Sequence, residues 1–135
     1  MVEILLTITD VDGIAVKFGT ADTLQIILNG NNKITLSDAQ YRNMGIWATN
    51  SSLKFSGGGS LNVSLYNEKF PCAINGKNLE FDNVKIVCNQ LNNQDPCGYA
   101  IRTAGTVIST NSSFDVTGFE CAIDSGSLEM KKIAV

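Results

Sequence analysis

The chain has 135 residues, 44% of them hydrophobic, which suits one domain with its own core over residues 1–135. Its net charge of −3, with no run of Lys and Arg, argues against nucleic-acid binding. Histidine is absent, which excludes Ser-His-Asp and Cys-His catalysis.

The first predicted element is an apolar strand over residues 2–8, which lacks the basic start and cleavage site of a signal peptide. No apolar run reaches the roughly 20 residues that span a bilayer, so we expect no membrane insertion. Asp10-Val-Asp12-Gly13 is similar to the opening of a calcium loop, but the other ligands are missing. We therefore interpret it as an acidic turn and predict no metal site.

Five imperfect copies of one strand-turn-strand unit follow. Residues 72–86 align without a gap with residues 121–135, and every apolar position falls on an apolar position. Within a unit, apolar and polar residues alternate, which predicts strands with one buried face. Each copy carries an anchor isoleucine, and these lie 22 to 32 residues apart: Ile14, Ile46, Ile74, Ile101 and Ile123.

These repeats predict an all-β protein, a short right-handed parallel β-helix (solenoid) of about five coils with three strands each. Asn and Gly, which tolerate positive φ, are expected at the corners, and Gly57-Gly-Gly59 is one such corner. A β-sandwich of about seven antiparallel strands stays open as the alternative, because alternation alone does not separate the two folds.

The repeat also carries a family resemblance. It is similar to the parallel β-helix repeats of bacterial surface proteins with carbohydrate-binding domains and, more broadly, to the pectate-lyase-like superfold. This resemblance implies a β-helix and carbohydrate binding but brings no catalytic motif. The residues that carry it are Gly45, Ile46, Leu53, Phe55, Gly57, Gly59, Leu61 and Val63.

The residues that follow the anchor isoleucines should form one outward column. An exposed tryptophan beside an amide, a guanidinium and a carboxylate is typical of a sugar-binding face, and Tyr41 in the preceding loop joins the candidates. The alternative is that Trp47 packs against the loop with Tyr41 and Arg42. Arg102 and Asp124 are expected to form an exposed ladder pair. The predicted column is Ala15, Trp47, Asn75, Arg102 and Asp124.

The cysteines divide into two pairs. Cys72 and Cys121 lie two residues before an anchor, so we expect an inward column that also holds Asp12, Met44 and Tyr99. Two coils separate these two thiols, too far for a disulfide, and both are predicted to be free. Cys88 and Cys97 bracket a polar loop. A disulfide between them would staple that loop and imply an oxidising compartment; the sequence leaves this pairing open.

We therefore expect a non-enzymatic carbohydrate-binding module that needs no cofactor and belongs to a bacterial surface or secreted protein. It would be extracellular or at the cell surface if it is part of a larger exported protein. Two alternatives stay open: a structural or interaction solenoid without a small ligand, and a fragment of a polysaccharide lyase or hydrolase. The apolar segments at both ends favour excision from a longer chain with neighbouring domains, or an end-to-end homodimer.

Overall fold

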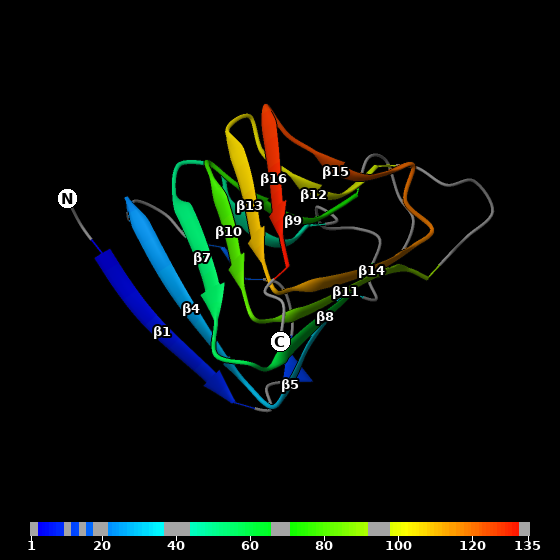
Figure 1. The fold of residues 1–135 in the computed structure, drawn as a ribbon. Coiled ribbons are helices and arrows are strands. Elements are labelled where there is room, and N and C mark those ends of the chain that lie inside the picture. Colours follow the sequence, from blue (N-terminus) through cyan, green and yellow to red (C-terminus); the bar gives the residue numbers. More distant parts are fainter. Residues whose placement is uncertain are drawn as a thin grey trace.

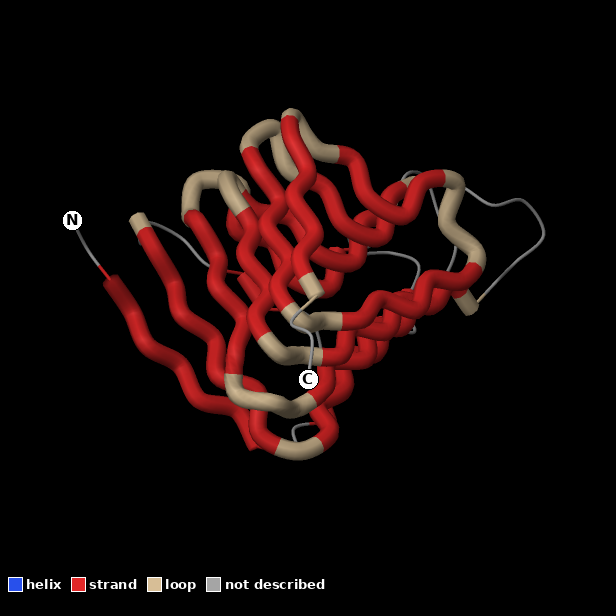
Figure 2. The backbone as a smooth tube through the Cα atoms, viewed as in Figure 1, coloured by secondary structure: helices blue, strands red, loops and turns tan. Residues whose placement is uncertain are grey.

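The computed structural model describes residues 3–9, 12–13, 16–17, 22–36, 44–65, 71–91 and 98–132, with side chains described within 22–35, 44–65, 71–91 and 98–132. All regular structure in these segments is β-strand (Figure 2). The same segments contain no helix that is long and apolar enough to cross a membrane.

The strands form three sheets in which all neighbours are parallel. Sheet A contains, in spatial order, β1 (Glu3–Thr9), β4 (Thr23–Asn29), β7 (Ser52–Ser56), β10 (Leu79–Asp82), β13 (Thr106–Thr110) and β16 (Ser127–Lys131). Sheet B contains β2 (Asp12–Gly13), β5 (Asn31–Leu36), β8 (Ser60–Leu65), β11 (Lys85–Gln90) and β14 (Ser113–Thr117). Sheet C contains β3 (Val16–Lys17), β6 (Met44–Ala48), β9 (Cys72–Gly76), β12 (Tyr99–Arg102) and β15 (Cys121–Asp124).

The chain visits the three sheets in turn and returns to the same sheet after every third strand. The sheets therefore enclose the core from three sides, as Figure 1 shows. The all-β prediction is confirmed, and the parallel pairing rules out the antiparallel sandwich for the described residues. The arrangement is consistent with the predicted parallel β-helix.

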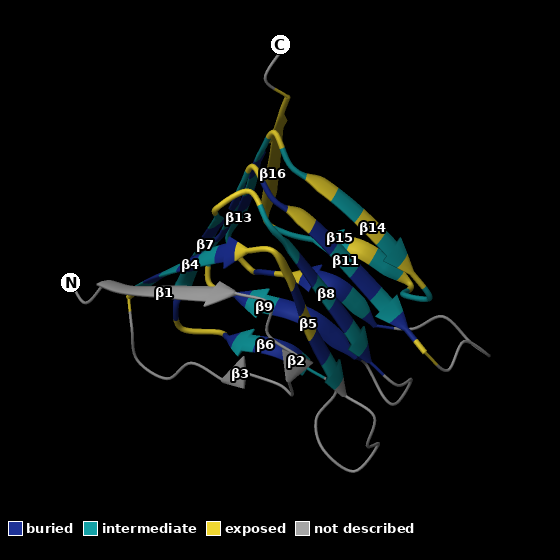
Figure 3. Cartoon of the chain, turned by 90° about the horizontal axis from the view of Figure 1, so that it is seen from below, coloured by how far each residue is buried: buried dark blue, intermediate teal, exposed yellow. Residues whose placement is uncertain are grey.

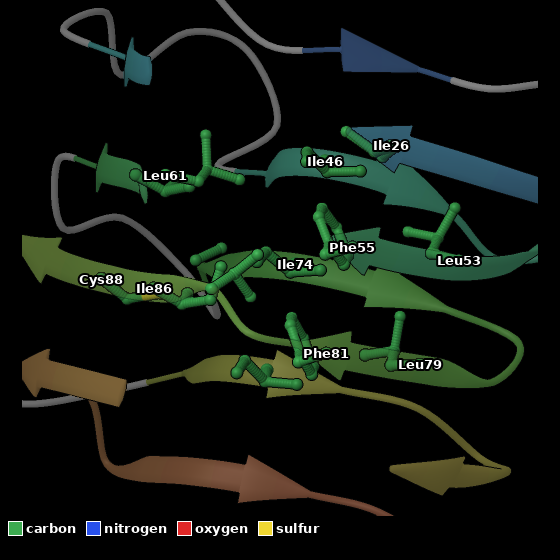
Figure 4. Packing of buried hydrophobic residues seen from close by; sticks show 14 of the residues in the cluster. Ile26, Ile46, Leu53, Phe55, Leu61, Ile74, Leu79, Phe81, Ile86 and Cys88 are labelled. Carbon is green, nitrogen blue, oxygen red and sulfur yellow. The ribbon is translucent and has the colours of Figure 1, made fainter. Parts of the chain in front are cut away.

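Like residues stack on like residues inside the three sheets (Figure 4). Leu53 is in register with Leu79, and Phe55 with Phe81, and all four side chains are at most 2% exposed. The Phe55 and Phe81 rings stack with their centroids 5.0 Å apart, and Phe114 meets Phe81 edge-on at the same distance. Such columns form because the side-chain period of two keeps the same face of each strand inward in successive coils.

The corners between sheet A and sheet B explain why Asn and Gly are so common. Each of these corners in coils with described residues holds a residue with positive φ, which glycine and asparagine adopt most readily. A Cβ at Gly57 would lie 2.6 Å from the Leu28 carbonyl oxygen, so this corner also needs glycine for space. The positive-φ residues at these corners are Gly30, Gly57, Gly58, Asn83 and Asn111.

The predicted register is wrong near the start of the chain. Val16 pairs with Ile46 and Lys17 with Trp47, so neither Ile14 nor Ala15 holds the predicted place. Asp12 pairs with Lys33 in sheet B and does not join the column of Met44. The shift is two residues, which leaves the alternation of faces unchanged and therefore leaves no trace in the hydrophobic pattern.

The fourth unit places Val107, not its apolar neighbour Ile108, in the core column. Val107 is fully buried and in register with Leu79. Ile108 pairs with Glu80 on the outer side of sheet A. Because Val107 and Ile108 are neighbouring apolar residues, hydrophobicity alone does not tell which of them faces the core.

Burial ends at the last described strands. All five residues of β16 are exposed, and residues of β14 alternate between exposed and intermediate (Figure 3). Leu128 and Met130, which continue columns that are buried elsewhere, are 49% and 56% exposed. The core columns thus remain open at this end of the described structure.

Candidate functional site

The predicted outward column exists on sheet C. Trp47 is in register with Asn75, Asn75 with Arg102, and Arg102 with Asp124. The strands β6, β9, β12 and β15 supply one residue each. Of the isoleucines that precede them, Ile46, Ile74 and Ile101 are buried in the core, and Ile123 is partly buried against it. Four of the five predicted members are therefore together; at the fifth position Lys17 replaces Ala15.

A short hydrogen-bond chain orders the first half of the column. The Trp47 indole Nε1 donates to Thr49 Oγ1 over 2.5 Å, and Thr49 Oγ1 donates to Asn75 Oδ1 over 3.0 Å. Thr49 thus accepts the hydrogen bond of the indole N–H and links Trp47 to the side-chain amide of Asn75 in the neighbouring coil. The ring itself is half-buried.

Arg102 organises the second half of the column. Its Nε lies 3.4 Å from Asp124 Oδ2, so the predicted ladder pair is present. The two side chains are 52% and 45% exposed, and such an exposed pair adds at most about 1 kcal/mol to stability. The Arg102 guanidinium carbon also lies 4.4 Å from the centre of the Tyr99 ring, a cation–π arrangement.

Tyr99 is a site residue that the sequence pattern missed. It shares a register column with Cys72 and Cys121, which predicted an inward side chain. Instead its ring lies against the exposed guanidinium of Arg102. Cys72, its register partner in β9, is 4% exposed although both strands continue with two buried residues in succession, so the difference lies in the side chain at this position.

A hollow of about 500 Å³ adjoins the column where sheet C turns toward sheet A. Two hydrogen bonds brace its rim: the Thr103 hydroxyl donates to the Lys77 carbonyl oxygen over 2.6 Å, and the Thr106 amide donates to Asn78 Oδ1 over 3.0 Å. The hollow is open, and no carboxylate of the described residues lines it. It is lined by Thr49, Asn75, Gly76, Lys77, Asn78, Arg102, Ala104 and Gly105.

The described thiols are unsuited to catalysis. Cys72, Cys88 and Cys121 are free, and Cys72 and Cys88 are at most 4% exposed. Burial raises the pKa of both buried thiols to about 12; the nearby Arg102 charge partly opposes this for Cys72. Both therefore stay protonated near neutral pH and behave as small apolar groups.

Some predicted residues lie outside the described part of the chain. Tyr41 is one of them, as is Cys97. Cys88 is a free thiol with its side chain in the core, so the disulfide with Cys97, which the sequence leaves open, gains no support. Among the described residues, no group of three or more Cys, Asp and Glu side chains could hold a metal ion.

Comparison with protein-family models, with curated proteins and with solved structures finds no match to this chain. The sheet C column and its hollow must therefore be interpreted from their own chemistry.

Proposed function

We propose that this chain is a non-enzymatic carbohydrate-binding module built on a short right-handed parallel β-helix. The right hand follows from a general rule, because parallel strands joined by crossovers have this hand in nearly all proteins. The order in which the chain visits its three sheets supports the β-helix. A bacterial surface or secreted protein is the proposed setting, supported by the sequence resemblance alone.

The observation that carries the proposal is the column of Trp47, Asn75, Arg102 and Asp124 beside an open hollow. The apolar face of a sugar ring can pack on an indole, while hydroxyl groups exchange hydrogen bonds with amide, guanidinium and carboxylate groups. Successive coils lie about 4.8 Å apart, so the column presents these groups at a regular spacing.

The same column favours binding over cleavage. Glycosidases place two carboxyl groups on either side of the bond that they cleave. The column holds one carboxylate, Asp124, and that group is already paired with Arg102. A lyase fragment is the enzymatic alternative; activity on a uronate polymer that disappears in Arg102→Ala would establish it and overturn our proposal.

Trp47 gives a direct test because it is the only tryptophan in the sequence. We expect a binding glycan, found on a glycan array, to change its fluorescence and to shift the amide signals of residues 47–49, 75–78 and 99–105 in NMR titrations. Trp47→Ala should weaken this binding at least tenfold, because it removes the stacking surface; affinity is measured by calorimetry.

Val87→Ala is the matched control. Val87 lies on the outer side of sheet B, in register with Asn62 and Asp115 and away from the column. This variant should keep the wild-type affinity. If no glycan shifts the signals near Trp47, or if both variants bind equally well, the sheet C column is not a sugar-binding site.

An interaction solenoid without a small ligand is the second candidate, favoured by the open end at β16. Leu24, Leu53, Leu79 and Val107 are buried in their column because coils cover them on both sides, whereas Leu128 is 49% exposed. An apolar surface that packs against the end of this column would bury Leu128. The partner that we consider is a second copy, joined end to end through the β14–β16 edge.

A further inference from the structure

A second hollow surface runs along the corners between sheets A and B. Two depressions, about 570 and 300 Å³ in volume, share Gly58, Gly59 and Lys85 and so form one furrow. None of the residues that line the sheet C hollow takes part in it. The side chains that give the furrow its chemistry are Asn31, Ser60, Asn83, Lys85, Asn111, Ser112, Ser113, Lys131 and Lys132.

The backbone of the corners keeps the furrow shallow and polar. Gly58, Asn83 and Asn111 have positive φ, so the chain turns here without a bulky side chain. A Cβ at Gly58 would meet only Asn83 Nδ2, at 3.6 Å. The Asn111 amide donates to Asn83 Oδ1 over 3.3 Å, which stacks two exposed amide groups along the axis of the coils.

Positive charge gathers in the furrow although the chain as a whole carries −3. Lys85, Lys131 and Lys132 are exposed and line it, and no carboxylate from the described part of the chain does. Within the described residues, only Lys131 of these three forms an ion pair, with Glu129 over 3.1 Å. The Lys131 and Glu129 side chains are 61% and 53% exposed, so an incoming anion can replace Glu129 as the partner of Lys131 at little cost in free energy.

We infer that this furrow binds an anionic linear glycan whose charge is carried by sulfate or carboxylate groups. The lysines meet the charges, and the amide and hydroxyl groups of Asn and Ser meet the sugar hydroxyls. A linear chain fits because equivalent corners repeat every ~4.8 Å along the axis. The furrow is separate from the sheet C column, so this inference does not depend on the proposed function.

A nucleic acid fits the furrow less well. Proteins that bind single strands combine a broad cationic groove with aromatic side chains that stack on the bases. The furrow has three lysines and no aromatic residue in its lining. Single-stranded DNA therefore serves as the competing probe in the test.

The experiment measures binding of four probes by calorimetry: a heparin-derived oligosaccharide, a polygalacturonate oligomer, a neutral dextran oligomer and a DNA oligonucleotide. We expect binding of the sulfated probe, the uronate probe or both, weakening as NaCl is raised. Lys85→Ala should weaken it about three- to fivefold, as loss of one exposed charge contact does. The double variant Lys85→Ala/Lys132→Ala should weaken binding more than tenfold.

Ser113→Glu gives a second variant that adds a negative charge at an exposed lining position, and it should abolish binding. Lys54→Ala, which removes a lysine from the outer side of sheet A, should bind like the wild type. The inference is overturned if neither anionic glycan binds, if Lys54→Ala weakens binding as much as Lys85→Ala, or if the DNA binds more tightly than both glycans.

Discussion

At the scale of single residues, the structure separates side chains that stabilise the core from side chains that could contact a ligand. Cys88 stacks between Val63 and Val116 in sheet B and is fully buried. Cys72 Sγ lies 3.5 Å from the carbonyl oxygen of Ile74, to which it donates a weak hydrogen bond. Both thiols serve as compact apolar groups in positions where a larger residue would disturb the columns.

The raised pKa of these thiols predicts a pH dependence of stability. The pKa of Cys72 and Cys88 is about 12 in the folded protein, whereas an unfolded thiol titrates near ~8.5. As pH rises from ~8.5 toward 12, the unfolded chain loses these protons first, so the free energy of unfolding should fall. Urea unfolding at pH 8 and pH 10.5 measures the slope.

A Cys72→Ala/Cys88→Ala variant separates the thiols from other groups that titrate at high pH. It should show a shallower loss of stability between the two pH values than the wild type. Identical slopes in the variant and the wild type would contradict the pKa values given for the buried thiols.

At the scale of elements, the packing between sheets depends on one aromatic group. Phe81 in β10 stacks on Phe55 in β7 and meets Phe114 in β14 edge-on, so it joins sheets A and B. The next member of the column after Phe81 is Ser109, and it is only 2% exposed. Phe114 is one of the partly buried residues packed against this core, on the sheet B side.

Phe81→Ala should therefore lower the free energy of unfolding by about 3–5 kcal/mol, measured by urea denaturation. The loss combines the transfer of a buried ring with the cavity that remains between two other rings. Phe81→Leu should cost clearly less, because it keeps most of the volume. A loss below ~1 kcal/mol in Phe81→Ala would mean that the ring group does not hold the two sheets together.

How far the sequence predicts this fold depends on the length of each repeat. The repeats around Ile46, Ile74, Ile101 and Ile123 predicted the register of the sheet C column correctly. The short strands near Val16 offered no such pattern, so a two-residue slip went unnoticed. The alternation of apolar and polar residues also did not predict the contact between Tyr99 and Arg102, or the lysines that line the corners.

At the scale of the whole molecule, the coils differ in how well they are covered. Inner strands such as β7 and β10 have neighbours on both sides, whereas β16 has only β13 among the described strands. Solenoids gain stability from contacts between adjacent coils, so an end coil is the least stabilised part. Covering the end at β16 would bury Leu128 and Met130.

If two copies meet at this end, the wild type should form a concentration-dependent dimer in analytical ultracentrifugation. Met130→Lys should shift it toward the monomer, because a charge would have to be buried in the interface. Ile108→Lys lies in the strand next to β16 but on the outer side of sheet A, so it adds the same charge without placing it on the end face and should leave the dimer intact. A monomeric wild type at all concentrations would exclude the end-to-end homodimer.

The in-register pairing of successive coils has a consequence for how such a protein can evolve. Tyr99 pairs with Cys72, 27 residues earlier, so one period of sequence corresponds to one complete coil. Deleting or duplicating that period would join strands whose inner and outer faces already agree. Unequal recombination could thus lengthen or shorten the rod by whole coils, and losing this period would set Trp47 directly beside Arg102.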